Sequence, residues 1–249
     1  MVQELNPIGE EHSAVSSISR MKVLSGSALK VIACLSMLTD HLAKFYLYKF
    51  AWTETVLFTA LGKVITPYQL MLMFGRFAFP LFVFLLVIGF ERTHNKTKYG
   101  LNLLLLAILS EIPFNLMSGQ SLLFPKQNVV FTLFMGFVAL CCLERFKTKP
   151  IIGLVSVVLL YLVSRLSHAD YQSAGFIFIL LMYGLRKEGI IRCVAAPVLL
   201  QMKAMVFLSL LLTTLYNGKR GFIKTPLLKY CFYAFYPVHM LVVYGLSLL

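Results

Sequence analysis

Residues 75–90 read GRFAFPLFVFLLVIGF, a nearly continuous apolar run with one charged side chain near its start. Similar apolar runs recur from residue 28 to the end of the chain, and short charged segments separate them. About 20 residues of helix cross the ~30 Å hydrocarbon core of a bilayer, where backbone groups must bond within their own segment. The strict apolar–polar alternation of barrel strands is absent. The sequence therefore predicts an all-α fold, a polytopic helical bundle in a membrane.

The composition excludes a soluble globular domain. Of the 249 residues, 59% are apolar and 13% are charged, and the mean hydropathy is +0.82. A soluble domain carries about twice this share of charged residues. The net charge of +13 would indicate a nucleic-acid partner in a soluble protein. In a membrane protein it reports topology instead, because Lys and Arg flank spans on the cytoplasmic side. We expect the lipid bilayer as a partner and no nucleic acid.

We expect about nine spans, at residues 28–49, 76–91, 99–118, 128–143, 150–165, 173–186, 190–202, 204–217 and 229–249. Two of them, 190–202 and 204–217, are short, so eight or ten crossings remain open. With the N-terminus in the cytoplasm, only seven of the 23 Lys and Arg residues fall on the outer side: Lys44, Lys49, Lys63, Arg76, Lys126, Arg165 and Lys203. This asymmetry predicts a multi-pass cell-membrane protein with its N-terminus inside and its C-terminus outside.

The segments between the spans give the domain organisation. Residues 1–27 are polar and mixed in charge, which is typical of a cytoplasmic tail rather than a signal peptide. Residues 28–249 form one membrane domain. The longest segment between predicted spans is 50–75. We expect its amphipathic middle, Val56 to Ile65, to lie flat on the outer surface of the membrane. The five cysteines show no metal-ligand spacing, so no metal is predicted.

The first span carries two ionisable side chains on one face. Lys30 and His41 are eleven residues apart, close to three helical turns, with a rise of about 16 Å between them. This distance is comparable to an extended pantetheine arm, with phosphates at one end and a thioester at the other. Ionisable groups inside a membrane are costly and indicate function. The structural alternative is a lysine that reaches the interface and a histidine bonded to a neighbouring helix.

Asp40 lies next to His41 but cannot orient it, because adjacent side chains of a helix point about 100° apart. Its nearest local partner is Lys44, one turn further, and an ion pair between them is the structural alternative. Otherwise Asp40 should reach a donor on another span.

Further polar residues lie inside or at the ends of later spans. Glu111 lies beside a proline in the third span, and His239 lies beside a proline in the last. With Asp40, His41 and Asn115, both fall in the middle or outer half of the bilayer, so one cluster is geometrically possible. Arg76 and Asn128 are alternative donors for an oxyanion, and Tyr171 opens the sixth span. Arg92 and Lys96 belong to a basic loop that suits phosphate. The structural alternative is that these charges only reflect the excess of Lys and Arg on the cytoplasmic side.

Several motifs resemble one known family. The strings DH in the first span, GRFAFPLFVFLLVIGF, SEIPFN, NVVFTL, DYQSAG, LYNGKRG and FYAFYPVHML occur in order over about 30–245. They resemble the TraX family, whose namesake acetylates the N-terminal amine of conjugative pilin. The Lys30–His41 spacing also resembles the wider superfamily of transmembrane acyltransferases, in which acyl-CoA enters from the cytoplasm. The chain departs from that superfamily in having no Arg-x-x-Arg after the second span.

The resemblance implies an acetyl-CoA-dependent enzyme with His41 as the catalytic residue and Lys30 and Arg92 on the CoA side. An acceptor amine or hydroxyl needs a base, and a histidine with an ordinary pKa near 6.5 can act as one. Glu111 or His239 would orient His41 from a neighbouring helix, and Asp40 is a further candidate catalytic residue. The acceptor is a peptide, a glycan or a lipid headgroup. Two rival hypotheses are a proton-coupled transporter and an accessory membrane protein without chemistry of its own.

Overall fold

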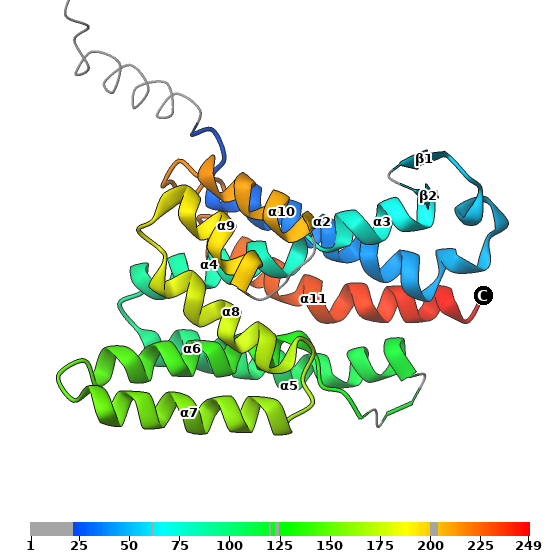
Figure 1. Cartoon of the computed structure of the whole chain (residues 1–249). Helices are drawn as coiled ribbons and strands as arrows, with labels where there is room; N and C mark the ends of the chain where they lie inside the picture. Colours follow the sequence, from blue (N-terminus) through cyan, green and yellow to red (C-terminus); the bar gives the residue numbers. More distant parts are fainter. Residues whose placement is uncertain (1–21, 61, 120, 123–124, 200–203) are drawn as a thin grey trace, which may run out of the picture.

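A computed structural model describes residues 22–60, 62–119, 121–122, 125–199 and 204–249. Most of the predicted tail, with Arg20, and the predicted outer cation Lys203 lie outside these residues. The elements are α2 (Gly26–Phe45), η1 (Leu47–Lys49), η2 (Ala51–Glu54), β1 (Phe58–Ala60), β2 (Lys63–Ile65), α3 (Pro67–Gly75), α4 (Ala78–Arg92), α5 (Lys96–Gly119), α6 (Val129–Arg145), α7 (Pro150–Leu166), α8 (Gln172–Gly184), α9 (Gly189–Leu199), α10 (Ala204–Thr214) and α11 (Pro226–Ser247). Helices therefore make up the described fold, apart from one short hairpin and the connecting loops, which confirms the predicted all-α class (Figure 1).

The helices have the length and polarity of membrane segments. In the described part of the chain, three helical stretches are long and apolar enough to cross a bilayer: Pro67–Arg92, Lys96–Gly119 and Pro226–Ser247. Shorter apolar helices accompany them. Helix α7 packs on α6 and α8 but leaves large apolar side chains exposed, with Ile151 at 77% and Leu166 at 74%. An apolar face of this extent fits contact with lipid rather than water.

The segment between the first two predicted spans differs from the expectation. Residues 56–65 are not one flat amphipathic element, because β1 and β2 pair as an antiparallel hairpin. The remainder contains two 3₁₀ turns and the helix α3, so the second span begins at Pro67 rather than at Arg76. Thr66 caps α3 by accepting a hydrogen bond from the Gln69 N–H. The cap and the proline at the helix start were readable signals for this helix.

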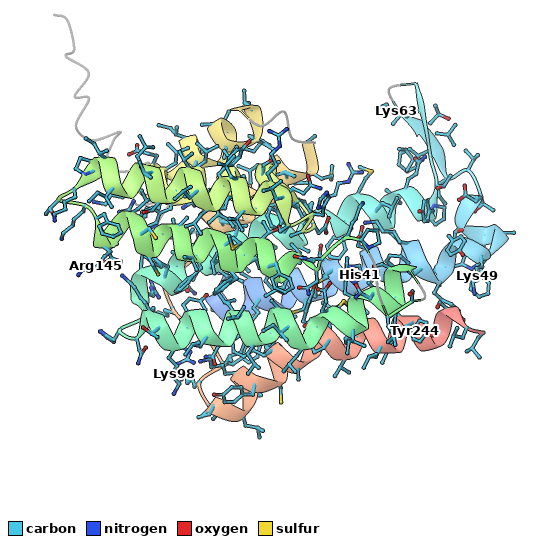
Figure 2. All side chains as sticks on the ribbon, turned by 90° about the horizontal axis from the view of Figure 1, so that it is seen from below. His41, Lys49, Lys63, Lys98, Arg145 and Tyr244 are labelled. Carbon is cyan, nitrogen blue, oxygen red and sulfur yellow. The ribbon has the colours of Figure 1, made fainter. Side chains whose placement is uncertain are left out.

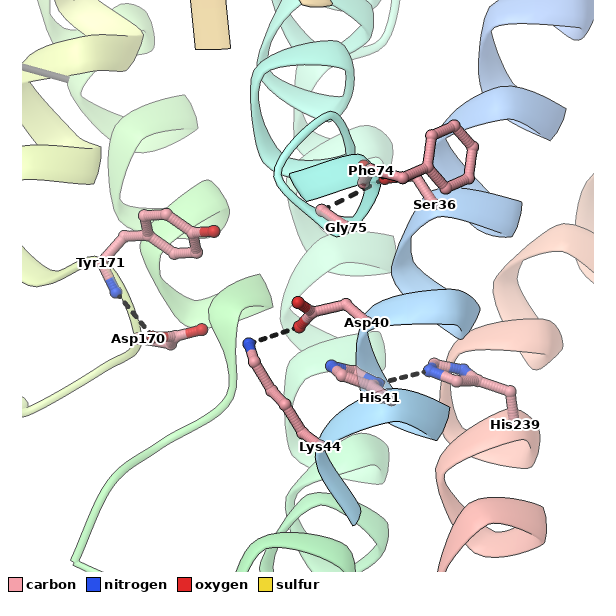
Figure 3. A network of polar contacts seen from close by, with 9 residues as sticks. All are labelled: Ser36, Asp40, His41, Lys44, Phe74, Gly75, Asp170, Tyr171 and His239. Carbon is pink, nitrogen blue, oxygen red and sulfur yellow. Dashed lines mark hydrogen bonds and ion pairs between the residues drawn. The ribbon is translucent and has the colours of Figure 1, made fainter. Parts of the chain in front are cut away.

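The second span is broken in its middle. Helix α3 ends at Gly75 and α4 begins at Ala78, because Pro80 has no N–H to continue the backbone hydrogen bonds across this point. The hydroxyl of Ser36 donates to the carbonyls of Phe74 (2.7 Å) and Gly75 (3.1 Å) at the break, and the Phe74 carbonyl also accepts from the Phe77 N–H (Figure 3). Arg76 therefore lies inside a 26-residue apolar stretch, not at its outer boundary as predicted.

The core forms around α4, whose buried side chains include Leu81, Val83 and Phe90. Helices α2, α6, α8 and α10 pack against it. Figure 2 shows Lys98 and Arg145 at one end of the bundle, Lys49 and Lys63 at the other, and His41 between them. The C-terminus lies at the end that carries the β1–β2 hairpin (Figure 1). There Lys49 donates to the carbonyl of Ser247 at the end of α11.

Helix α2 approaches the break so closely that residue 75 must be glycine. A Cβ on Gly75 would lie 2.4 Å from the Cβ of Asp40. We expect Gly75→Ala to lower the free energy of unfolding by about 1–3 kcal/mol, since the two helices must separate. Thermal unfolding of the detergent-purified protein measures this effect. Gly245→Ala is the matched control, because nothing lies within 4 Å of the added carbon, and it should keep wild-type stability or gain. Equal melting temperatures for both variants would contradict the close approach.

Candidate functional site

Two histidines from helices far apart in sequence face each other inside the bundle. The Nδ1 atom of His41 on α2 lies 2.8 Å from the Nε2 atom of His239 on α11. His239 is buried, and its Nδ1 atom lies 2.9 Å from the backbone carbonyl of Phe235. Figure 3 shows the two rings and their hydrogen bond. The structure therefore brings together two of the four predicted catalytic residues.

The partners of the two rings fix their tautomers. A carbonyl oxygen only accepts, so the Nδ1 atom of His239 must carry a proton. In the neutral ring, its Nε2 atom then accepts, and the proton of the shared bond belongs to Nδ1 of His41. The Nε2 atom of a neutral His41 keeps its lone pair. This arrangement is that of a general base held in orientation by a second imidazole.

His41 lines a cavity of about 340 Å³, which we call the histidine cavity. Asp40 also lines it, and its carboxylate pairs with Lys44 at 2.5 Å on the same helix. The structural alternative for Asp40, an ion pair one turn away, is therefore present. Lys126 and Asp170 line the same cavity. Partial removal from water raises the pKa of the Asp170 carboxyl, and the N–H of Tyr171 and nearby lysines partly offset this rise.

The predicted residue Tyr171 reaches this cavity from a strained loop. His168, Tyr171 and Gln172 all have positive φ angles, of 52°, 63° and 37°. Residues other than glycine avoid this region unless the surroundings hold them there, and such strain is concentrated at functional sites. Here the Tyr171 ring stacks on Phe79, with ring centroids 3.9 Å apart, and the Asp170 N–H donates to the carbonyl of Gln127.

A second cavity, of about 620 Å³, lies at the other end of α2. We call it the basic cavity, because it is lined by five cationic side chains: Lys30, Arg92, Lys98, Arg220 and Lys229. Among the described residues, no Asp or Glu lines it. Its aromatic lining includes Tyr99, Tyr216 and Phe232. A pocket of this charge fits a polyanion.

The loop that contributes Arg220 is fastened to the start of α2. The backbone N–H groups of Gly26 and Ser27 donate to the carbonyls of Lys219 and Arg220, both at 2.9 Å. The hydroxyl of Ser27 donates to the Arg220 carbonyl as well, at 2.7 Å. Gly221 has φ +88°, and a Cβ there would lie 2.4 Å from the Ser25 hydroxyl, so the turn requires glycine. The motif LYNGKRG thus shapes the mouth of the basic cavity.

The two cavities adjoin. Five residues line both of them: Met37, Phe82, Val129, Leu133 and Tyr236. These side chains therefore form a shared wall between the basic cavity and the cavity that His41 lines.

Glu111 and Asn128 form a separate network at the start of α6. Asn128 is fully buried and caps α6 by accepting from the Val130 N–H. Its amide nitrogen donates to the carbonyl of Ala107 and to the carboxylate of Glu111, so both amide hydrogens are engaged. The Asn128 N–H also donates to Glu111. Neither residue is among those that line the two cavities, so the structure does not bring them to His41.

Two other predicted binding residues also lie away from the cavity walls. Arg76 occupies the break between α3 and α4, close enough to Tyr171 for an electrostatic interaction. Lys96 pairs with Glu144 of α6 and lies over the Phe90 ring. Among the predicted CoA-side residues, Lys30 and Arg92 line the basic cavity.

Lys98, which the sequence places in the basic loop that suits phosphate, also lines the basic cavity, whereas Arg220 and Lys229 were expected only as cytoplasmic charges and are cavity residues as well. For Arg220, the signal was the glycine-flanked motif LYNGKRG. That motif alone does not reveal that its loop lies on residue 27, which is 193 positions away in the chain.

These features define a helical protein with three candidate membrane spans, in which His41 of a buried imidazole pair lines a polar cavity that adjoins a basic one. The sequence profile described as TraX protein matches residues 25–247, and the chain belongs to this family. It is similar to the probable fimbrial assembly protein FimC, serogroup H1, of Dichelobacter nodosus, with 28% identity over 249 aligned positions that cover 90% of this chain and 96% of the relative. No solved structure matches the chain.

The Glu111 network predicts a structural phenotype. Glu111→Ala leaves the N–H and amide of Asn128 without an acceptor, so we expect a loss of about 1–3 kcal/mol in the free energy of unfolding. Thermal unfolding in detergent measures the loss, and Glu111→Gln, which keeps an acceptor oxygen, should lose less. Both variants should retain wild-type function when it is normalised to the amount of folded protein. A Glu111→Gln protein with wild-type stability and no function would instead place this carboxylate in the chemistry.

Proposed function

We propose that this protein is a membrane-embedded acyltransferase that moves an acetyl group from cytoplasmic acetyl-CoA to an acceptor amine or hydroxyl at the outer side of the membrane. One observation carries the proposal: the basic cavity, free of carboxylates among the described residues, shares a wall of five side chains with the cavity that His41 lines. Membership of the TraX family supports the same reaction class.

The basic cavity suits the donor. CoA presents phosphates and an adenine at one end of a narrow arm and the thioester at the other end. Cationic side chains of Lys30, Arg220 and Lys229 match the phosphates, and aromatic side chains in the wall match the adenine. Lys30 and His41 are about 16 Å apart along α2, which the arm can span. The thioester would then lie near His41 while the phosphates stay in the basic cavity.

His41 supplies the proton transfers. In this mechanism, Nε2 of His41 takes a proton from the acceptor as its nitrogen or oxygen attacks the thioester carbonyl. A bond forms between the acceptor and the carbonyl carbon, and the C–S bond then breaks. The imidazolium returns its proton to the departing CoA thiolate. His239 holds the ring of His41 throughout through the Nδ1–Nε2 hydrogen bond.

The remaining residues have supporting roles in this proposal. Tyr171, fixed on Phe79 at the wall of the histidine cavity, contacts the acceptor or the oxyanion. Asp40 keeps Lys44 at the cavity through their ion pair. Arg76 acts through the electrostatic environment of Tyr171. Glu111 and Asn128 keep the start of α6 in place and have no direct contact with the reacting groups.

The orientation follows the positive charges. The end with the basic cavity would face the cytoplasm, where acetyl-CoA is made, with the N-terminus on the same side. Helices α9 and α10 pack against each other as a pair, and α10 returns the chain to the side of the membrane on which α9 begins. The predicted side of α11 is therefore the same whether or not this helix pair crosses the bilayer. The C-terminal end of α11 and the β1–β2 hairpin would then face outward, as the predicted topology requires. His41, which lines the histidine cavity, lies in the half of the bundle nearer that face (Figure 2).

The acceptor is a peptide, a glycan or a lipid headgroup. The relative of Dichelobacter nodosus is named for fimbrial assembly, which favours an exported peptide. Comparison of intact masses of exported peptides, glycans and lipids from cells with and without the protein identifies it. An acetyl increment that depends on the protein marks the acceptor.

A proton-coupled transporter is the second candidate, because the broken α3–α4 span is a feature that transporters share. The two functions differ in the mass of the substrate after the protein has acted on it. A transporter moves its substrate without a mass change, whereas the acyltransferase adds an acetyl group to the acceptor.

Removing the imidazole tests the mechanism. We expect His41→Ala to lower acetyl transfer at least about 100-fold, because the acceptor loses its general base. Acetyl-CoA binding should be unchanged, since the cationic side chains remain. His94→Ala, on the exposed loop after α4, is the matched control and should keep full activity. Correctly inserted His41→Ala protein that retains full transfer would remove His41 from the mechanism.

In the proposed function, the cationic side chains of the basic cavity determine the affinity for acetyl-CoA. Arg220→Gln and Lys229→Gln should each weaken acetyl-CoA binding about tenfold, because each loses one charge-assisted contact to phosphate. Titration calorimetry on the purified protein measures the dissociation constant, which should also rise with salt. Lys224→Gln is the control, since this lysine is exposed in the same loop but does not line the cavity. An equal effect of all three substitutions would indicate only a general charge effect.

A further inference from the structure

We infer that a ring of apolar side chains between the two cavities sets the length of the acyl chain that the protein accepts. This ring, the collar, consists of the five residues that line both cavities: Met37, Phe82, Val129, Leu133 and Tyr236. The inference rests on the proposed acyl transfer and adds the residues that select the acyl group.

The collar takes its side chains from several helices. Met37 comes from α2, Phe82 from α4, Val129 and Leu133 from α6, and Tyr236 from α11. Because each of these side chains lines both cavities, the collar lies between them, and the acyl end of a donor held in the basic cavity meets the collar on its way to His41.

The register of α2 places the collar beside the reacting carbonyl. Lys30, Met37 and His41 follow one another at spacings of seven and four residues, so they lie on one face of the helix. The rise is about 10 Å from Lys30 to Met37 and about 6 Å from Met37 to His41. A donor whose phosphates meet Lys30 therefore passes the level of Met37 before its thioester reaches His41, one helical turn further. The acceptor occupies the histidine cavity, so the acyl tail has to pack against the collar side chains.

The collar is held firmly enough to discriminate. Met37, Leu133 and Tyr236 are 7%, 8% and 7% exposed, and all three belong to the hydrophobic core. Close behind α6, a Cβ on Gly136 would lie 2.4 Å from Ile179, which leaves the helix little room to shift. In a packed apolar pocket, one extra methylene changes recognition by about 10–200-fold. A longer tail must therefore displace core side chains or occupy the space of the acceptor.

Chain-length dependence of acyl-CoA binding tests the collar without knowledge of the acceptor. Purified full-length protein is titrated with acetyl-CoA, propionyl-CoA and butyryl-CoA. We expect the wild type to bind butyryl-CoA at least about tenfold more weakly than acetyl-CoA. Phe82→Ala and Leu133→Ala widen the collar, so they should reduce this ratio to near one while they retain acetyl-CoA binding.

Two matched controls separate the collar from general loss of packing. Phe84→Ala and Leu140→Ala remove the same side-chain types from the same helices, at buried positions that line neither cavity. Both should lose stability but keep the wild-type preference for acetyl-CoA. If a collar variant fails to fold, Leu133→Met, which keeps the side-chain volume but is more flexible, should still shift the ratio toward the longer chain.

The outcomes distinguish the collar from the proposed function. Equal binding of all three acyl-CoAs by the wild type, or the same preference in collar and control variants, overturns the collar and leaves acyl transfer standing. Absence of binding of any acyl-CoA to the folded wild type overturns both. A wild-type preference for acetyl-CoA that only the collar variants lose supports the assignment.

Discussion

The hydrogen bond between the ring of His239 and the carbonyl of Phe235 determines the chemistry of the interior. Because a carbonyl has no proton to give, this single contact directs the proton of each ring and leaves one lone pair at Nε2 of His41. Proline at position 237 lies within this turn of α11. A backbone atom therefore acts as the third member of the chain, where many enzymes use a carboxylate.

Helix α2 connects that chemistry to the basic cavity. Its one face carries Lys30, Cys34, Met37 and His41 in sequence, and the first three of these line the basic cavity. The break between α3 and α4 lies against the same helix, since Ser36 donates to the carbonyls of Phe74 and Gly75. This hydroxyl and the N–H of Phe77 supply donors to carbonyls at the interruption, where a membrane offers no water to do so. The interruption also brings Gly75 and Asp40 together, at the wall of the histidine cavity.

Much of this organisation could be predicted from sequence, because apolar length and helical register are local properties. The predicted helices, the shared face of Lys30 and His41 and the contact of His41 with another span all follow from them. The hairpin and helix between residues 56 and 75 could not be read from hydrophobicity, since strands of three residues carry almost no periodic signal. A carboxylate inside a membrane is costly whatever its role. The sequence alone therefore could not decide whether Glu111 is a structural hydrogen-bond acceptor or a catalytic residue. Cavity residues such as Arg220 depend on contacts between distant segments.

The fastening of residues 219 and 220 onto the start of α2 has a consequence for biosynthesis. Of the described helices, α2 is synthesised first and supplies His41, whereas Arg220, Lys229 and His239 are synthesised only later, in or shortly before α11. A nascent chain without α11 has neither its second imidazole nor the Lys229 side of the basic cavity. Under the proposed function, insertion of α11 therefore completes the site, and a product that lacks this helix would be inactive.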